Sequence, residues 1–200
     1  RYTVFSLWDT YRNLHQLLTL VYPERQLEMV RSMVGMYREW GWLPKWELYG
    51  RETFTMEGDP SIPVIVDTWM KGLRDFDMDA AYEAMRKSAT TPGARNRMRP
   101  DIDPYIEKGY VPLGFYARDL SGDNSVSHAL EYYIADHALS LLADSLGKKD
   151  DAALFRARSL GYKNYYSTES GTFRPITKEG KFLTPFDPRQ GENFEPVPGF

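Results

Sequence analysis

Apolar residues recur at helical spacing along most of this 200-residue chain, and no stretch alternates apolar and polar residues for long enough to build a sheet. The spacing is clearest over residues 23–40 and 125–146. Pro23 suits the first position of a helix, and Gly41 and Gly147 are typical residues after a helix ends. The pattern therefore predicts an all-α fold.

Four other segments share this period, and they are residues 5–22, 61–73, 77–89 and 150–162. We expect residues 5–22 to form one helix whose buried stripe is Trp8, Tyr11, Leu14, Leu18 and Val21. In the helix over 125–146, the predicted buried face consists of Val126, Leu130, Tyr133, Ile134, His137, Leu141 and Leu142.

Two long segments, 41–61 and 91–112, are rich in turn-forming residues and are expected to be loops. Helix pairs that are joined alternately by short turns and long loops are typical of helical toroids. In such a fold the long loops of one rim would surround a central cavity. Both chain ends read as mid-protein sequence, so we expect one partial domain, residues 1–200, that continues at both ends.

Composition excludes several classes of protein. Lys and Arg number 25 against 28 Asp and Glu, and the signs are interspersed, which argues against a nucleic-acid partner. Cysteine is absent, so disulfides and thiolate metal sites are excluded. No apolar run approaches the ~20 residues that a membrane span needs. The three histidines lack the spacing of a zinc site, and no nucleophilic-serine motif occurs.

Trp8 and Asp9 stand together at the start of a predicted helix. Sugar recognition needs flat aromatic faces and carboxylates that accept hydrogen bonds from hydroxyls, and this pair offers both. The alternative is that Trp8 belongs to the core and Asp9 is a solvated or capping carboxylate.

Other candidates have similar alternatives. Trp40, Trp42 and Trp46 could line a sugar groove or form a small core beneath their loop. Asp59 could bind a hydroxyl or cap the helix after it. Glu131 could act as an acid, a base or a ligand, or lie on a solvated helix face.

Several motifs occur in an order that resembles glycoside hydrolase family 92, the calcium-dependent exo-acting α-mannosidases. The matching segments are Phe5-Ser6-Leu7-Trp8-Asp9-Thr10-Tyr11-Arg12, Met56-Glu57-Gly58-Asp59, Val64-Ile65-Val66-Asp67-Thr68-Trp69-Met70-Lys71-Gly72, Ser125-Val126-Ser127-His128-Ala129-Leu130-Glu131-Tyr132, Phe173-Arg174-Pro175 and Pro185-Phe186-Asp187-Pro188.

The resemblance implies part of an (α/α)6 barrel, with the family's N-terminal β-sandwich outside this chain. It implies an inverting exo-α-mannosidase, with α-1,2 linkages of mannan or N-glycans as the expected substrate. It also implies calcium as cofactor, and a bacterial periplasmic or secreted location. The catalytic acid, the base and the calcium ligands are expected beyond Phe200, so this chain alone should be inactive.

By the same resemblance, Trp8 and Asp9 contribute to binding the terminal mannose. Asp59 is a second candidate for substrate binding, and Glu131 is a weaker candidate for catalysis that is suggested only by its surroundings. Two alternatives stay open: another (α/α)6 enzyme, such as a trehalase-like hydrolase or a polysaccharide lyase, or a non-catalytic glycan-binding helical module.

Overall fold

The structure, a computed structural model, describes residues 1–115, 117–118 and 122–189. Eight α-helices dominate these residues: α1 (Leu7–Thr10), α2 (Leu14–Val21), α3 (Pro23–Trp40), α4 (Ser61–Met70), α5 (Met78–Thr90), α6 (Ile102–Lys108), α7 (Ser125–Ser145) and α8 (Lys149–Ser159), with the 3-10 helix η1 (Leu160–Asn164) after α8. The only strands there form antiparallel pairs of two residues each: β1 (Glu47–Leu48) with β2 (Arg51–Glu52), β3 (Ala117–Arg118) with β4 (Gly122–Asp123), and β5 (Tyr166–Ser167) with β6 (Thr172–Phe173). The prediction of a helical fold is confirmed.

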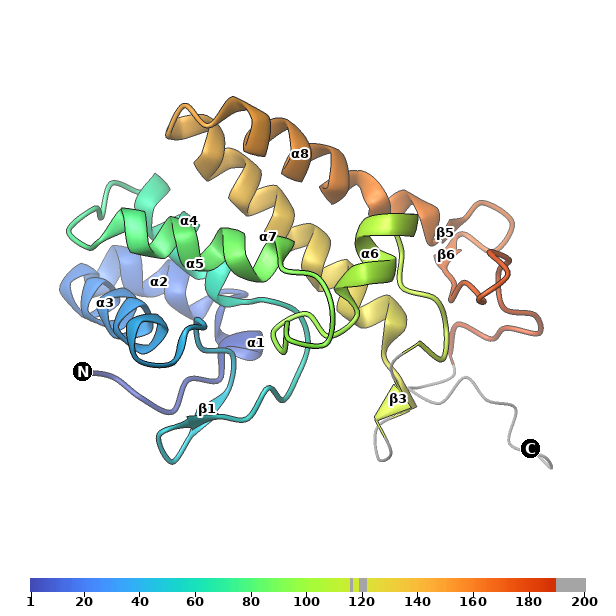
Figure 1. The fold of residues 1–200 in the computed structure, drawn as a ribbon, viewed down its shortest axis with the longest axis horizontal. Helices are drawn as coiled ribbons and strands as arrows, with labels where there is room; N and C mark the ends of the chain where they lie inside the picture. Colours follow the sequence, from blue (N-terminus) through green and yellow to red (C-terminus); the bar gives the residue numbers. More distant parts are fainter. Residues whose placement is uncertain (116, 119–121, 190–200) are drawn as a thin grey trace.

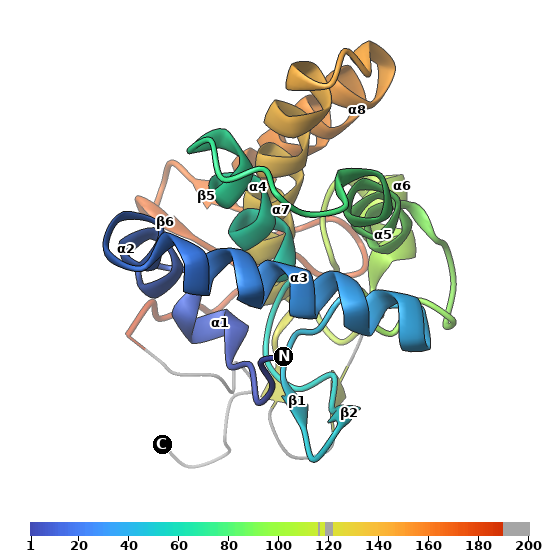
Figure 2. The ribbon, with the colours of Figure 1, turned by 90° about the vertical axis from the view of Figure 1, so that its left-hand side faces the viewer.

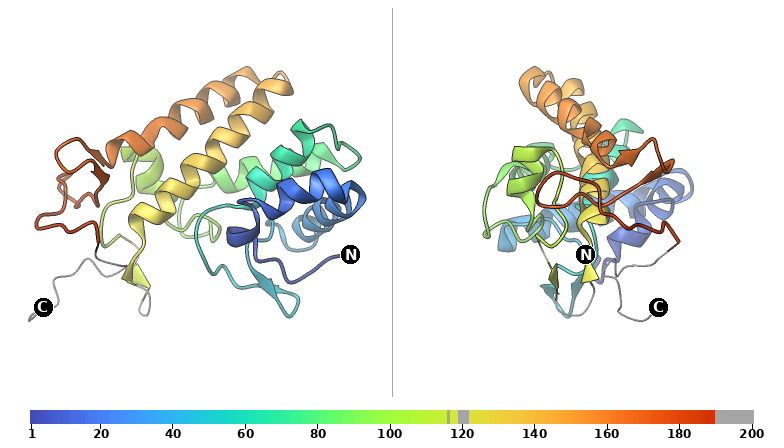
Figure 3. Two further views of the ribbon diagram at one scale, coloured as in Figure 1. Left: turned by 180° about the vertical axis from the view of Figure 1, so that it is seen from behind. Right: turned by 90° about the vertical axis from the view of Figure 1, so that its right-hand side faces the viewer.

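The long helices form three successive hairpins, α2 with α3, α4 with α5, and α7 with α8 (Figure 1). Their first helices are neighbours, since α4 contacts both α2 and α7. The α7–α8 pair runs obliquely to the long axis of the molecule, as Figure 3 shows from behind. Seen from the side, α3 crosses the molecule above the hairpin of β1 and β2 (Figure 2).

Local signals placed several helix ends correctly. α3 begins at Pro23 and ends before Gly41, whose φ of 86° is a left-handed conformation that glycine adopts without strain. α5 begins after Asp77, and the Asp77 carboxylate accepts a hydrogen bond from the Ala80 N–H at 3.0 Å. The expected loop over 91–112 contains α6, which the sequence pattern did not reveal.

The prediction of one helix over residues 5–22 is wrong. The chain breaks after Thr10 and resumes a helix at Leu14, and the Gln16 side chain donates to the Tyr11 carbonyl at 2.7 Å. This bond satisfies a backbone acceptor that the break leaves without a helical partner.

The predicted buried stripe of α2 is also wrong. His15 and Thr19 face inward, whereas Leu14 and Val21 are exposed. His15 Nδ1 lies 2.9 Å from Oε1 of Gln26 in α3, so a polar contact takes the place that the apolar stripe was expected to fill.

The predicted face of α7 is only partly right. Tyr133 and Leu142 are buried as predicted, whereas Ile134 and His137 are exposed. The buried face also carries the stripe His128, Tyr132 and Asp136, each four residues after the last. These three side chains pack against the loops that precede α4 and α6, as described below.

Two apolar clusters lie on either side of this region. The larger joins the N-terminal helices to the C-terminal half of α7 and to Ala152 and Phe155 of α8. The smaller gathers Tyr105, Tyr132, Tyr133 and Tyr165 beside the N-terminal half of α7. Among the described residues, no helix is both long and apolar enough to cross a membrane.

Truncation of the fully buried Phe155 to alanine should lower the free energy of unfolding by about 3–5 kcal/mol, because it leaves a cavity between α7 and α8. Its neighbour Leu154 is exposed, so Leu154→Ala should change stability far less. Chemical denaturation of both variants measures the difference; equal losses would contradict this packing of α8.

Candidate functional site

The turn of residues 57–59 lies directly against α7. Gly58 has a φ of 74°, and a Cβ atom added there would overlap with the Cβ of Glu131. Only glycine allows both this backbone conformation and this close approach. The backbone of Gly58 therefore lies directly against Glu131.

Glu131 in turn holds the end of α1. Its Oε2 accepts from the Tyr11 hydroxyl at 2.5 Å, and its Oε1 accepts from Nη2 of Arg12 at 2.7 Å. Burial and the bond to Glu131 raise the pKa of Tyr11, so the phenol stays protonated and donates. The Glu131 side chain is only 12% exposed and lies in a fixed, paired arrangement.

Trp8 and Asp9 lie in α1 beside this pair. The Trp8 ring is half-buried against the larger core, and its Nε1 is buried without a hydrogen-bond partner among the described residues. Asp9 is exposed, and its carboxylate accepts from the Ser6 hydroxyl at 2.8 Å. The main-chain N–H of Leu7 donates to the Lys45 carbonyl, which ties α1 to the long loop over 41–61.

An open groove of about 400 Å³ adjoins this region. Side chains from three neighbouring helices and from the end of α1 line it, and these include Tyr11, Arg12, Gln16, Met70, Ile134 and Leu141. Ile134 and Leu141 of α7, which were expected to be buried, therefore form part of one wall of a groove beside Arg12.

A buried acid–imidazole–acid cluster fixes the turn from its other side. His128 Nε2 lies 2.6 Å from Oε2 of Glu57, and its Nδ1 lies 2.8 Å from Oδ2 of Asp101. Asn124 donates to the other oxygen of Glu57, and the Tyr132 hydroxyl donates to the other oxygen of Asp101.

The ionisation of this cluster follows from its burial. Burial lowers the pKa of His128 to about 3, and the Lys45 ammonium acts in the same direction, so the imidazole is neutral and carries one N–H. Burial raises the pKa of Asp101, which favours the protonated acid beside Nδ1 of His128. The contact between Nε2 and Glu57 is short, but Oε2 of Glu57 has no hydrogen-bond partner of good geometry among the described residues.

Asp59 lies in a second buried network. Its Oδ2 accepts from the Ser88 hydroxyl at 2.6 Å and from Nε of Arg99 at 3.0 Å. Arg99 also donates to Asp136 of α7 at 2.8 Å, and none of these three charged side chains is exposed. The alternative that Asp59 caps α4 is wrong, because its carboxylate makes no bond to the start of that helix.

The three tryptophans of the loop region have separate surroundings. Trp40 lies edge-on to Phe54, and the Lys87 ammonium lies 4.8 Å from the centre of a Trp42 ring. Trp46 is half-buried, and its main-chain N–H is bound by Glu52.

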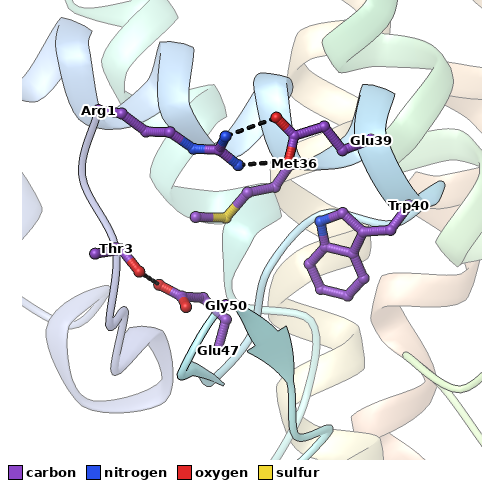
Figure 4. Close-up of a pocket in the computed structure, with 7 residues that line it drawn as sticks. All are labelled: Arg1, Thr3, Met36, Glu39, Trp40, Glu47 and Gly50. Atoms are coloured by element: carbon purple, nitrogen blue, oxygen red, sulfur yellow. Dashed lines mark hydrogen bonds and ion pairs between the residues drawn. The ribbon is translucent and has the colours of Figure 1, made fainter.

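A further cavity of about 320 Å³ lies beside Trp40, between α3 and the first residues of the chain (Figure 4). The Arg1 guanidinium there makes two bonds to Glu39, and Thr3 donates to Glu47 at 2.7 Å. This cavity is lined by neither Trp8 nor Arg12.

Within residues 1–115, 117–118 and 122–189, no group of three or more His, Asp or Glu side chains is arranged to hold a metal ion. The carboxyl groups of Glu57 and Asp101 lie against His128, Asn124 and Tyr132 instead.

A family model, the glycosyl hydrolase family 92 catalytic domain, matches residues 1–197. The chain belongs to glycosyl hydrolase family 92. The resemblance seen in the ordered motifs is thereby confirmed.

Solved family 92 structures have the same fold as this chain. One is an inverting mannosidase of Bacteroides thetaiotaomicron, with a TM-score of 0.85 and 32% identity over 93% of this chain. Another is an α-mannosidase of the same organism, with a TM-score of 0.84 and 36% identity over 96% of this chain; it is also solved with mannoimidazole. This chain covers 25% of each of these two chains.

A curated relative from Arthroderma benhamiae, called an uncharacterized secreted glycosidase, is 28% identical over 162 residues. The match covers 78% of this chain and 21% of that protein. The family 92 chain described here thus spans about a quarter of the length of these relatives.

The structure brings Trp8, Asp9 and Glu131 into one region and buries Asp59 below it. Sequence reasoning missed Arg12, Glu57, Asp101 and His128 as parts of this arrangement. The sequence contained one signal for His128. It stands four residues before Tyr132 and eight before Asp136, a spacing that places the three side chains on one face of a helix.

Replacement of Asp101 by asparagine should change the pH dependence of stability. Because the pKa of Asp101 is raised, the free energy of unfolding falls as pH rises from about 3.9 until Asp101 ionises. The lowered pKa of His128 has the opposite effect and raises the free energy of unfolding between about pH 3 and about pH 6.5.

The amide of Asp101→Asn imitates the protonated acid at every pH. This variant should therefore lose the decline that Asp101 causes above about pH 3.9, and its stability relative to the wild type should rise by up to about 1.4 kcal/mol per pH unit. Denaturation from pH 3 to 8 measures both profiles. Asp103→Asn, an exposed neighbour, is the matched control and should follow the wild type. Parallel profiles for wild type and Asp101→Asn would contradict the raised pKa of Asp101.

Proposed function

We propose that this chain is part of an inverting exo-α-mannosidase that hydrolyses terminal α-mannosyl residues of mannan or N-glycans, with α-1,2 linkages as the expected substrate. The observation that carries the proposal is the family 92 match over residues 1–197. The similarity to two solved mannosidases, one of them called inverting, supports it.

We further propose that the three helical hairpins belong to an (α/α)6 barrel. Their first helices, α2, α4 and α7, lie side by side as the inner helices of such a barrel would. Leu17 and Leu20 of α2 are exposed, and further helices of the same domain would cover such a face.

In this proposal Trp8 and Asp9 form one wall of the subsite for the terminal mannose. The exposed Asp9 carboxylate is available to accept hydrogen bonds from hydroxyl groups, and the Trp8 ring lies next to it. Asp59 has an indirect role in this proposal. Its carboxylate is fully buried and bound by Arg99 and Ser88, so it fixes the turn that packs against Glu131.

Inversion requires a carboxylic acid and a carboxylate base about 6.5–9.5 Å apart, on either side of the sugar. We place both, together with the calcium ligands, outside residues 1–200. Glu131 is paired with Arg12 and Tyr11, an arrangement suited to positioning more than to proton transfer. Calcium would assist by binding sugar hydroxyls in the complete site. An exported location, as in a bacterial periplasm, completes the proposal, and the secreted relative supports export.

The protein in which this chain occurs should hydrolyse an aryl α-mannoside and α-1,2-mannobiose, and should release β-mannose first. Proton NMR of the fresh product measures the anomer, and EDTA should abolish turnover that calcium restores. Initial release of α-mannose would contradict inversion, and full activity in EDTA would contradict the role of calcium.

In the same protein, Asp9→Ala should lower kcat/KM for the aryl α-mannoside by roughly 10- to 100-fold, because a charged acceptor for sugar hydroxyls is lost. Asp79→Ala changes an exposed carboxylate in α5 and is the control. Wild-type kinetics for Asp9→Ala would remove Asp9 from the site.

A further inference from the structure

The guanidinium of Arg12 lies at the open edge of the candidate site. Its Cζ is 4.9 Å from the centre of the Tyr11 ring and 5.4 Å from that of a Trp8 ring. One of its N–H groups is bound by Glu131, yet 47% of the side chain is exposed. Arg12 is thus held in place and is still accessible.

Arg12 has hydrogen-bonding capacity to spare. A guanidinium carries five N–H donors, and within the described part of the chain Glu131 is its one hydrogen-bond partner. The open groove of about 400 Å³ is lined by Arg12 with Tyr11 and Gln16. Free donors therefore lie beside a space that is large enough for a sugar ring.

Arg12 and Asp9 are complementary in chemistry and close in space. Partial burial opposes the charge of Arg12, but its bond to Glu131 and the nearby charges, that of Asp9 among them, raise its pKa. A sugar hydroxyl both donates and accepts. An ionised carboxylate can only accept and a guanidinium can only donate, so the two together can satisfy a pair of adjacent hydroxyls.

We propose that Arg12 is a second sugar-binding residue of the subsite that Trp8 and Asp9 form, and that Glu131 is its positioning residue. The planar fork of Arg12 donates to the oxygens of a vicinal diol, while Asp9 accepts from the hydroxyls of the same ring. This inference rests on the proposed function and adds to it the recognition of a diol by paired charges.

The support of Arg12 comes from three elements of the fold. Glu131 projects from α7, the Tyr11 hydroxyl occupies its second oxygen, and Gly58 packs against its Cβ. Glu131 thus has little freedom to leave Arg12. Its contribution to sugar binding acts through the direction in which it holds the guanidinium.

The test compares Arg12→Lys, Glu131→Gln, Glu131→Ala and the double variant Arg12→Lys/Glu131→Ala in the protein that carries this chain. Calorimetry with mannose gives Kd, and aryl α-mannoside kinetics give KM and kcat. Arg12→Lys keeps the charge but loses the fork, and should raise Kd and KM about tenfold. Arg25→Lys, which changes an exposed arginine stacked on Tyr22, is the matched control and should leave both unchanged.

Glu131→Ala should also raise the Kd for mannose. Glu131→Gln should raise it less, because the amide oxygen can still accept from Arg12. The double variant should bind mannose no more weakly than Arg12→Lys alone. Wild-type Kd and KM in Arg12→Lys would overturn the inference, and additive losses would overturn the positioning role of Glu131. Thermal denaturation of each variant confirms folding, and Arg12→Gln replaces any lysine variant that does not fold. If the wild-type protein binds and cleaves mannosides, and substitution of Arg12 leaves its Kd and KM unchanged, this inference alone is overturned. If the wild-type protein neither binds nor cleaves mannosides, the proposed function is overturned as well.

Discussion

The polar stripe on α7 is the constraint on which the rest of the structure depends. His128, Tyr132 and Asp136 are buried, and each would be costly to bury without a partner. One loop supplies Asp101, beside His128 and Tyr132, and Arg99, beside Asp136. Asp136 is also bound by Tyr105 of α6 and Arg158 of α8. The loop that contains Arg99 and Asp101 is therefore fixed by hydrogen bonding rather than by regular secondary structure.

The same stripe sets the turn at residues 57–59. Glu57 reaches His128, and Asp59 reaches the Arg99 that also binds Asp136. With both carboxylates anchored, Gly58 is pressed onto α7 beside Glu131. Glu131 then binds the end of α1, where Trp8 and Asp9 lie. A continuous set of contacts thus runs from the buried charges to the exposed site.

The buried polar contacts also explain which faces of the helices remain open. In α2 the inward positions are taken by polar side chains, and in α7 a polar stripe shares the buried face with apolar residues, while several leucine and isoleucine side chains of the two helices are exposed. The chain spans about a quarter of the length of its solved relatives. In the proposed barrel, further helices would cover the exposed apolar faces.

The sequence by itself determined the helical class, the ends of α3 and α5, and the family, because these depend on spacing, on residues such as Pro23, Gly41 and Asp77, and on ordered motifs. It also indicated Trp8 and Asp9 as a pair. Only the tertiary structure decided which faces of α2 and α7 are buried, and that Arg12, Glu131 and Gly58 meet. The physical reason is that hydrophobic periodicity marks an apolar face without saying what covers it, whereas buried polar groups are placed by partners that are distant in sequence.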